Sequence, residues 1–104
     1  MYVTFVLTHS AFEPDPYNVC RGRFTKVEAP RSDEEYLDDI FRATNNIDES
    51  WTQRDPPGIE FEVNQAFRDR GCRSTSVGDS VTLMDWDGKN SRTYRCAPIG
   101  WTRV

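Results

Sequence analysis

The chain has few of the residues that usually carry catalysis or bind metals. It contains one histidine, His9, and three cysteines, Cys20, Cys72 and Cys96. The cysteines are odd in number and never form a C-x-x-C pair, so we expect reduced thiols, no disulfide framework and no bound metal. His9 would need a partner and a cleft to act as a general base, and the sequence predicts neither.

Other signatures of enzymes and membrane proteins are also missing. The six glycines never form G-x-G-x-x-G or a P-loop, and no G-x-S-x-G occurs. The apolar start of the chain is too short for a membrane span and lacks the features of a signal segment. These absences predict a cytoplasmic protein that is not an enzyme and uses no cofactor.

Cys72 is the one candidate reactive thiol. It follows Arg68 and Arg70, whose charges would favour its thiolate form. Without a positioned base, the sequence gives it no catalytic role.

What the chain does contain fits one small globular domain, residues 1–104. Hydrophobic residues make up 37% of its 104 residues, including six Phe, four Tyr and three Trp, enough for one modest core. The net charge of −4 argues against a protein that binds duplex nucleic acid mainly through phosphates. The charge is uneven, since residues 33–62 are strongly acidic and the part after residue 62 is slightly basic.

Alternating patterns predict strands over residues 2–8, 19–28, 80–86, 91–96 and 101–104. The first has apolar residues on both faces, so we expect a central position in the sheet. The second changes phase at Gly22, which indicates a bulge or bend. Residues 59–70 fit a short strand or a helical turn, and both readings stay open.

One amphipathic helix begins after Ser32. Glu35 lies three residues further on, which completes a capping box. The predicted buried stripe comprises Tyr36, Leu37, Ile40 and Phe41, with Ala43 or Thr44 beyond. We expect an α+β domain, a small and mostly antiparallel β-sheet with this helix packed on one face.

The last two long strands predict a candidate binding surface. Met84 and Trp86 should lie on the sheet face away from the helix, beside Arg95 of the partner strand. Trp and Arg often anchor interfaces, so these three residues are predicted to bind a partner. The alternative is that a loop, such as the one with Trp51, folds over this face.

The acidic side of the helix is a second candidate surface. Asp38 and Asp39 could meet a basic partner there. The alternative is an ordinary solvated helix face.

The C-terminal part resembles a known family. The run from Arg73 to Val81 (RSTSVGDSV), then Tyr94 and Ile99-Gly100-Trp101, is similar to the YodL-like domain. The helix followed by Thr44-Asn45-Asn46, and then Trp51, is also similar to members of this group, so the resemblance covers about the last two thirds of the chain. Pro98 departs from the pattern. It implies a small non-enzymatic domain of plasmids, conjugative elements and phages that modulates host processes by binding host proteins.

Two functional hypotheses follow from the sequence. The first is a protein that binds a host protein and modulates or inhibits it. The second is a small β-barrel-like module that binds RNA or single-stranded nucleic acid. It would use two aromatic residues and a basic cluster, namely Trp86, Tyr94, Arg68, Arg70 and Arg73.

Overall fold

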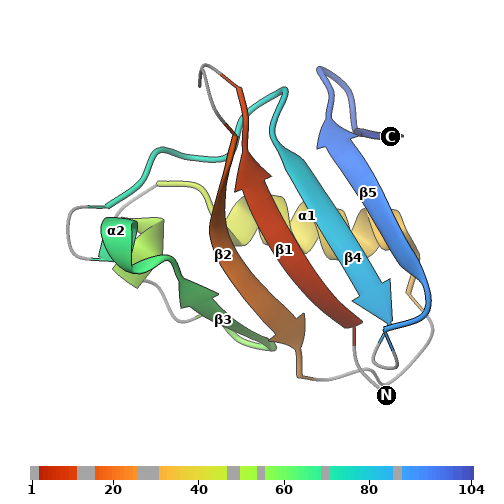
Figure 1. The fold of residues 1–104 in the computed structure, drawn as a ribbon, viewed down its shortest axis with the longest axis horizontal. Coiled ribbons are helices and arrows are strands. Elements are labelled where there is room, and N and C mark those ends of the chain that lie inside the picture. Colours follow the sequence, from red (N-terminus) through yellow and green to blue (C-terminus); the bar gives the residue numbers. More distant parts are fainter. Residues whose placement is uncertain are drawn as a thin grey trace.

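Six strands form one antiparallel sheet in the order β3-β2-β1-β4-β5-β6 (Figure 1). The computed structural model describes residues 3–11, 16–25, 31–46, 50–53, 56–68, 71–85 and 88–104. The strands are β1 (Val3–His9), β2 (Tyr17–Phe24), β3 (Ile59–Val63), β4 (Ser80–Asp85), β5 (Ser91–Cys96) and β6 (Trp101–Arg103). The helices are α1 (Asp33–Ala43), a 3-10 turn η1 (Trp51–Gln53) and α2 (Gln65–Arg68). The chain is therefore a small α+β domain, as its sequence predicts.

The first strand is central, as predicted. β1 pairs with β2 on one side and with β4 on the other. Val3, Phe5, Leu7 and His9 point into the core, while the alternate residues are half-buried. Strands that connect two neighbours in this way need apolar side chains on at least one face, which the alternation supplies.

The second strand differs from its prediction. Leu7 pairs with Cys20 but Thr8 pairs with Asn18, so the extra residue of the bulge is Val19 and not Gly22. Residues 26–28, the end of the predicted strand, lie outside the described residues. Gly22 serves a different purpose, because a β-carbon there would lie 2.4 Å from the carbonyl oxygen of Glu60. Only glycine allows this close approach of β2 and β3.

The helix starts as its sequence predicts. The Ser32 hydroxyl accepts from the Glu35 amide, and the Glu35 carboxylate accepts from the Ser32 amide, which forms the capping box. The buried stripe differs at one position. Phe41 is half-buried and meets Trp101 of β6 edge-on, while Ala43 and Thr44, the two alternatives for the end of the stripe, are both buried.

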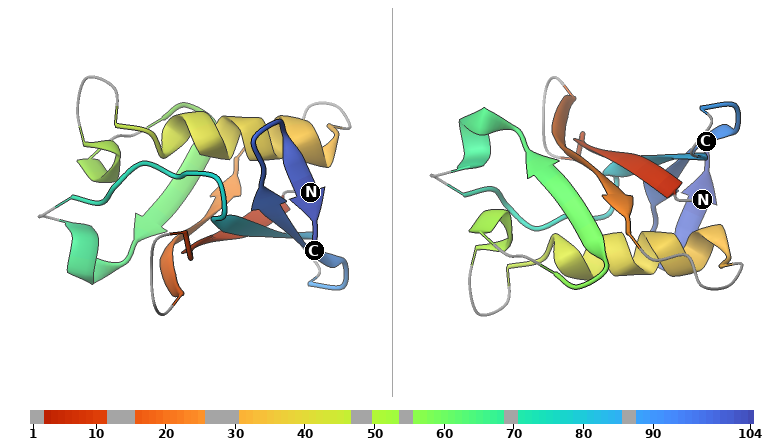
Figure 2. Two further views of the ribbon diagram at one scale, coloured as in Figure 1. Left: turned by 90° about the horizontal axis from the view of Figure 1, so that it is seen from above. Right: turned by 90° about the horizontal axis from the view of Figure 1, so that it is seen from below.

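The N-terminal end of α1 is tied to β5. The Arg92 guanidinium donates to both oxygens of Asp33, at 2.7 and 2.9 Å, and also to Asp85 of β4. The Tyr94 hydroxyl donates to Asp33 at 2.6 Å. The hydrogen bond from Arg92, more than any other cause, holds the pKa of Asp33 below its ordinary value. Figure 2 shows α1 running along one side of the sheet.

The described part of residues 59–70, which ends at Arg68, contains both of the structures that the sequence leaves open. β3 ends at Val63 and α2 begins two residues later. The Asn64 side chain accepts from the amide of Ala66, as an N-cap does, which explains the switch from strand to helix.

Candidate functional site

One face of the sheet is uncovered in the part of the chain that the structure describes. Its side chains alternate with those of the core, and every one is half-buried or exposed. We call this surface the open face. It comprises Thr4, Val6, Thr8, Asn18, Arg21, Arg23, Glu60, Glu62, Ser80, Thr82, Met84, Ser91, Thr93, Arg95 and Thr102.

Threonine hydroxyls on the open face bond within the sheet. Those of Thr82 and Thr93 lie 2.8 Å apart across β4 and β5. The Thr8 hydroxyl donates to the Asn18 side chain, and that of Thr4 to the carbonyl of Met84. These bonds fix side-chain rotamers before any partner arrives, which lowers the entropy cost of binding.

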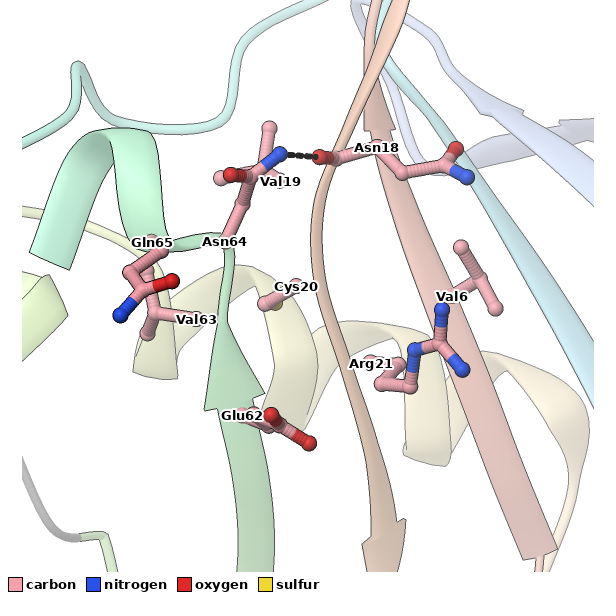
Figure 3. A pocket seen from close by; sticks show the side chains of 9 residues that line it. All are labelled: Val6, Asn18, Val19, Cys20, Arg21, Glu62, Val63, Asn64 and Gln65. Carbon is pink, nitrogen blue, oxygen red and sulfur yellow. Dashed lines mark hydrogen bonds between the residues drawn. The ribbon is translucent and has the colours of Figure 1, made fainter.

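The open face is hollowed over β1, β2 and β3. Val6 of β1, Arg21 of β2 and Glu62 of β3 border a hollow of about 540 Å³ (Figure 3). The Asn64 side chain closes one end by donating to the carbonyl of Asn18 at 3.0 Å. The same three border residues also line an adjoining hollow of about 520 Å³ that extends toward Arg23. The two hollows give the face relief that a flat sheet would lack.

Two of the three predicted hairpin residues lie on the open face. Met84 is half-buried opposite Ser91, and Arg95 is exposed opposite Thr102 of β6. Trp86 lies outside the described residues. The sequence did not predict the other end of the open face, which is formed by Arg21, Arg23, Glu60 and Glu62. The alternation in R-G-R and E-F-E could have indicated that these charged side chains share one face of the sheet.

The Trp51 side chain does not lie on the open face. The Trp51 ring is fully buried on the core side, against His9 and Phe61. Its indole nitrogen donates to the carbonyl of Arg73 at 2.9 Å. Trp51 itself therefore does not cover Met84.

The two helix carboxylates are in different situations. Asp38 is exposed on α1, whereas Asp39 accepts from both Arg31 and Arg42. Burial opposes ionisation of Asp39, but these two hydrogen bonds hold its pKa below the ordinary value. Of these two carboxylates, that of Asp38 has no ion pair among the described residues.

A second polar group lies at the other end of β1, inside the protein. Asp79 is fully buried and accepts five hydrogen bonds. Two come from the Arg73 guanidinium, at 2.7 and 2.8 Å, and the others from the amides of Ser10, Ala11 and Ser76. Asp79 therefore joins the end of β1 to the turn that leads into β4.

His9 and Cys72 meet beside this carboxylate. The Cys72 sulfur lies 3.6 Å from His9 Nδ1, and His9 Nε2 lies 3.1 Å from the Thr75 hydroxyl. The Asp79 carboxylate is 3.8 Å from the same Nε2. The sequence reasoning gave His9 no partner because 63 positions separate it from Cys72.

Stability at acid pH should report on Asp79. Burial disfavours its charged form, but the bonds from Arg73, Ser76 and Ala11 hold its pKa below the ordinary value of 3.8. This stabilisation is full above the unfolded pKa of about 3.9 and is lost as the pH falls through the folded pKa. Urea unfolding should therefore show a lower free energy at about pH 3 than at about pH 6. If the free energy of unfolding falls less over this pH range in Asp79→Asn than in the wild type, the Asp79 carboxylate is a source of the pH dependence.

Within the described residues, no three His, Cys, Asp or Glu side chains are grouped to hold a metal ion. No helix in the same part of the chain is long and apolar enough to cross a membrane.

Comparison of the chain with protein-family models, curated proteins and solved structures found no match. The resemblance to the YodL-like domain therefore stays a prediction.

Proposed function

We propose that this chain is a small protein-binding module without catalytic activity, which uses the open face to bind a host protein and to modulate or inhibit it. The single observation that carries the proposal is the uncovered, internally hydrogen-bonded face of the sheet. The proposal takes α1 as the cover of the other face, supported by the four α1 residues in the common core. A cytoplasmic setting and an origin in a phage or mobile element follow the sequence-based expectation.

The charges on the open face define the chemistry of the partner. Arg21 and Arg95 are exposed and have no ion pair among the described residues, whereas Arg23 pairs with Glu60. An unpaired arginine on an ordered surface offers five donors to a carboxylate. We therefore propose a protein partner that presents an acidic patch to Arg21 and Arg95.

The nucleic-acid hypothesis has less support. Tyr94 donates to Asp33 on the α1 side of the sheet, and Arg73 is held by Asp79. Trp86, Arg70 and the side chain of Arg68 lie outside the described residues. Binding of single-stranded nucleic acid needs a continuous basic strip around an aromatic platform. Tyr94 and Arg73 are not positioned to contribute to such a strip.

The test begins with affinity capture of a partner from host lysate and its identification by mass spectrometry. Binding of that protein is then measured by calorimetry. The double variant Arg21→Glu/Arg95→Glu should bind at least about tenfold more weakly, because each change opposes like charges at the contact. The matched control is Arg103→Glu, which makes the same kind of charge change on the other side of β6.

Capture of a protein does not by itself support the proposal. Equal weakening by Arg103→Glu would indicate a nonspecific charge effect. Unchanged binding by the double variant would place the contact elsewhere and overturn the proposed surface.

A further inference from the structure

We propose that Cys72 and His9 form a nucleophilic thiol–imidazole pair, and that Cys72 is a site of modification by small disulfides. This inference is independent of the open face.

The pair is built from separate segments. His9 ends β1, and Cys72 lies between α2 and the turn before β4. The sulfur lies 3.6 Å from Nδ1, within hydrogen-bond reach for a thiol. A nucleophile and a base at such a distance, with the base oriented by a third group, is the general arrangement of an activated nucleophile.

A chain of hydroxyls sets the tautomer of His9. The Thr44 hydroxyl donates to the carbonyl of Ile40 at 2.8 Å, so its oxygen accepts from Thr75, also at 2.8 Å. Thr75 has then used its proton, and its oxygen accepts from His9 Nε2–H at 3.1 Å. Nδ1 is left with its lone pair directed at the Cys72 thiol. His9 is thus placed as a proton acceptor for Cys72.

Charged and titratable groups face His9 from several of the described segments. The Asp79 carboxylate lies 3.8 Å from Nε2, and the hydroxyl chain ends on a carbonyl in the last turn of α1, the negative end of the helix dipole. Among the described residues, the cation that faces this cluster is Arg73, whose charge is matched by Asp79 at 2.7 Å. From β2, the Tyr17 ring lies 6.1 Å from that of His9, and Cys20 has a thiol whose pKa is raised by burial to about 12.

The other two cysteines serve as internal controls. Cys72 is partly exposed, while Cys20 and Cys96 are buried. Burial raises the pKa of the Cys20 thiol to about 12, and burial also raises that of Cys96. Cys72 is the only one of the three whose environment combines a base with access to solvent.

The reaction is an exchange that needs no further reagent. The Cys72 thiol gives its proton to His9 Nδ1, and the thiolate attacks one sulfur of the small disulfide. A new S–S bond forms, the old one breaks, and the departing thiolate takes the proton from His9. Thiol and disulfide thereby give a mixed disulfide and a free thiol, with electrons balanced. A disulfide suits this site because the exchange requires only an accessible sulfur and a base.

The experiment measures the reaction of the folded protein with dithiodipyridine, followed by absorbance and by mass spectrometry of each cysteine peptide. Cys72 should be modified first. Near pH ~7 its rate should be at least about tenfold higher than in His9→Gln, a gap that narrows above pH ~9.5, where a thiol ionises without a base. Thr75→Val, which breaks the hydroxyl chain but keeps His9, should also slow the reaction, and Thr75→Ser should retain the wild-type rate.

Circular dichroism checks the fold of each variant. If His9→Gln does not fold, the comparison of Thr75→Val with Thr75→Ser carries the test. The proposal is overturned if Thr75→Val reacts as fast as Thr75→Ser, if His9→Gln is folded and reacts like the wild type, or if Cys20 or Cys96 reacts as fast as Cys72.

Discussion

Replacing Asp79 with asparagine is expected to lower the free energy of unfolding by about 3–5 kcal/mol, the usual cost of breaking a buried ion pair. The Asp79 side chain is fully buried and the Arg73 side chain is 27% exposed. Asparagine keeps the shape of the side chain but removes the negative charge that pairs with Arg73. Its NH2 group can only donate hydrogen bonds, so it would face another donor at a position where the carboxylate oxygen now accepts. The loss should therefore exceed that of an ordinary hydrogen bond.

Urea unfolding followed by circular dichroism measures the effect. The control is Asp38→Asn, the same substitution at an exposed position on α1, which should change stability by less than about 0.5 kcal/mol. If both variants are equally stable, Asp79 does not hold the end of β1 to the turn before β4.

Replacing Trp51 with alanine is expected to cost about 3–5 kcal/mol, as for other large-to-small changes in a core. The indole is fully buried against His9 and Phe61, so its loss leaves a cavity. Its nitrogen also donates to the carbonyl of Arg73, which would lose a buried partner.

Trp51→Phe separates these two effects. Phenylalanine keeps much of the ring volume and loses the hydrogen bond, so it should cost clearly less than alanine. Ile99→Ala, at a position that is 95% exposed, is the control and should leave the unfolding midpoint unchanged. A Trp51→Ala protein as stable as this control would contradict a core position for Trp51.

Local patterns predicted most of the elements. The capping box of Ser32 and Glu35 and the alternation of Val3, Phe5 and Leu7 act over a few residues, so the sequence displays them directly. The bulge was misplaced because Gly22 looked like a break in the pattern. Its actual role is to allow close contact with β3, 38 or more positions along the chain, which no local pattern reveals.

The sequence predicted part of the open face but not the pair of His9 and Cys72. Met84 and Arg95 follow from the period of a hairpin, and the structure places both on the open face. The other end of that face depends on β2 pairing with β3, which the sequence did not predict. The pair of His9 and Cys72 depends on how β1 meets the segment before β4, a long-range contact that their spacing conceals.

The central claim is that the open face contacts the partner, and methyl NMR spectra test it most directly. Val6 and Met84 carry methyl groups on this face, whereas Leu37 and Val81 carry theirs in the core. Adding the captured partner should shift or broaden the Val6 and Met84 signals and leave those of Leu37 and Val81 in place. Unchanged Val6 and Met84 signals, with backbone changes at Glu34 and Asp38 on α1, would contradict the account.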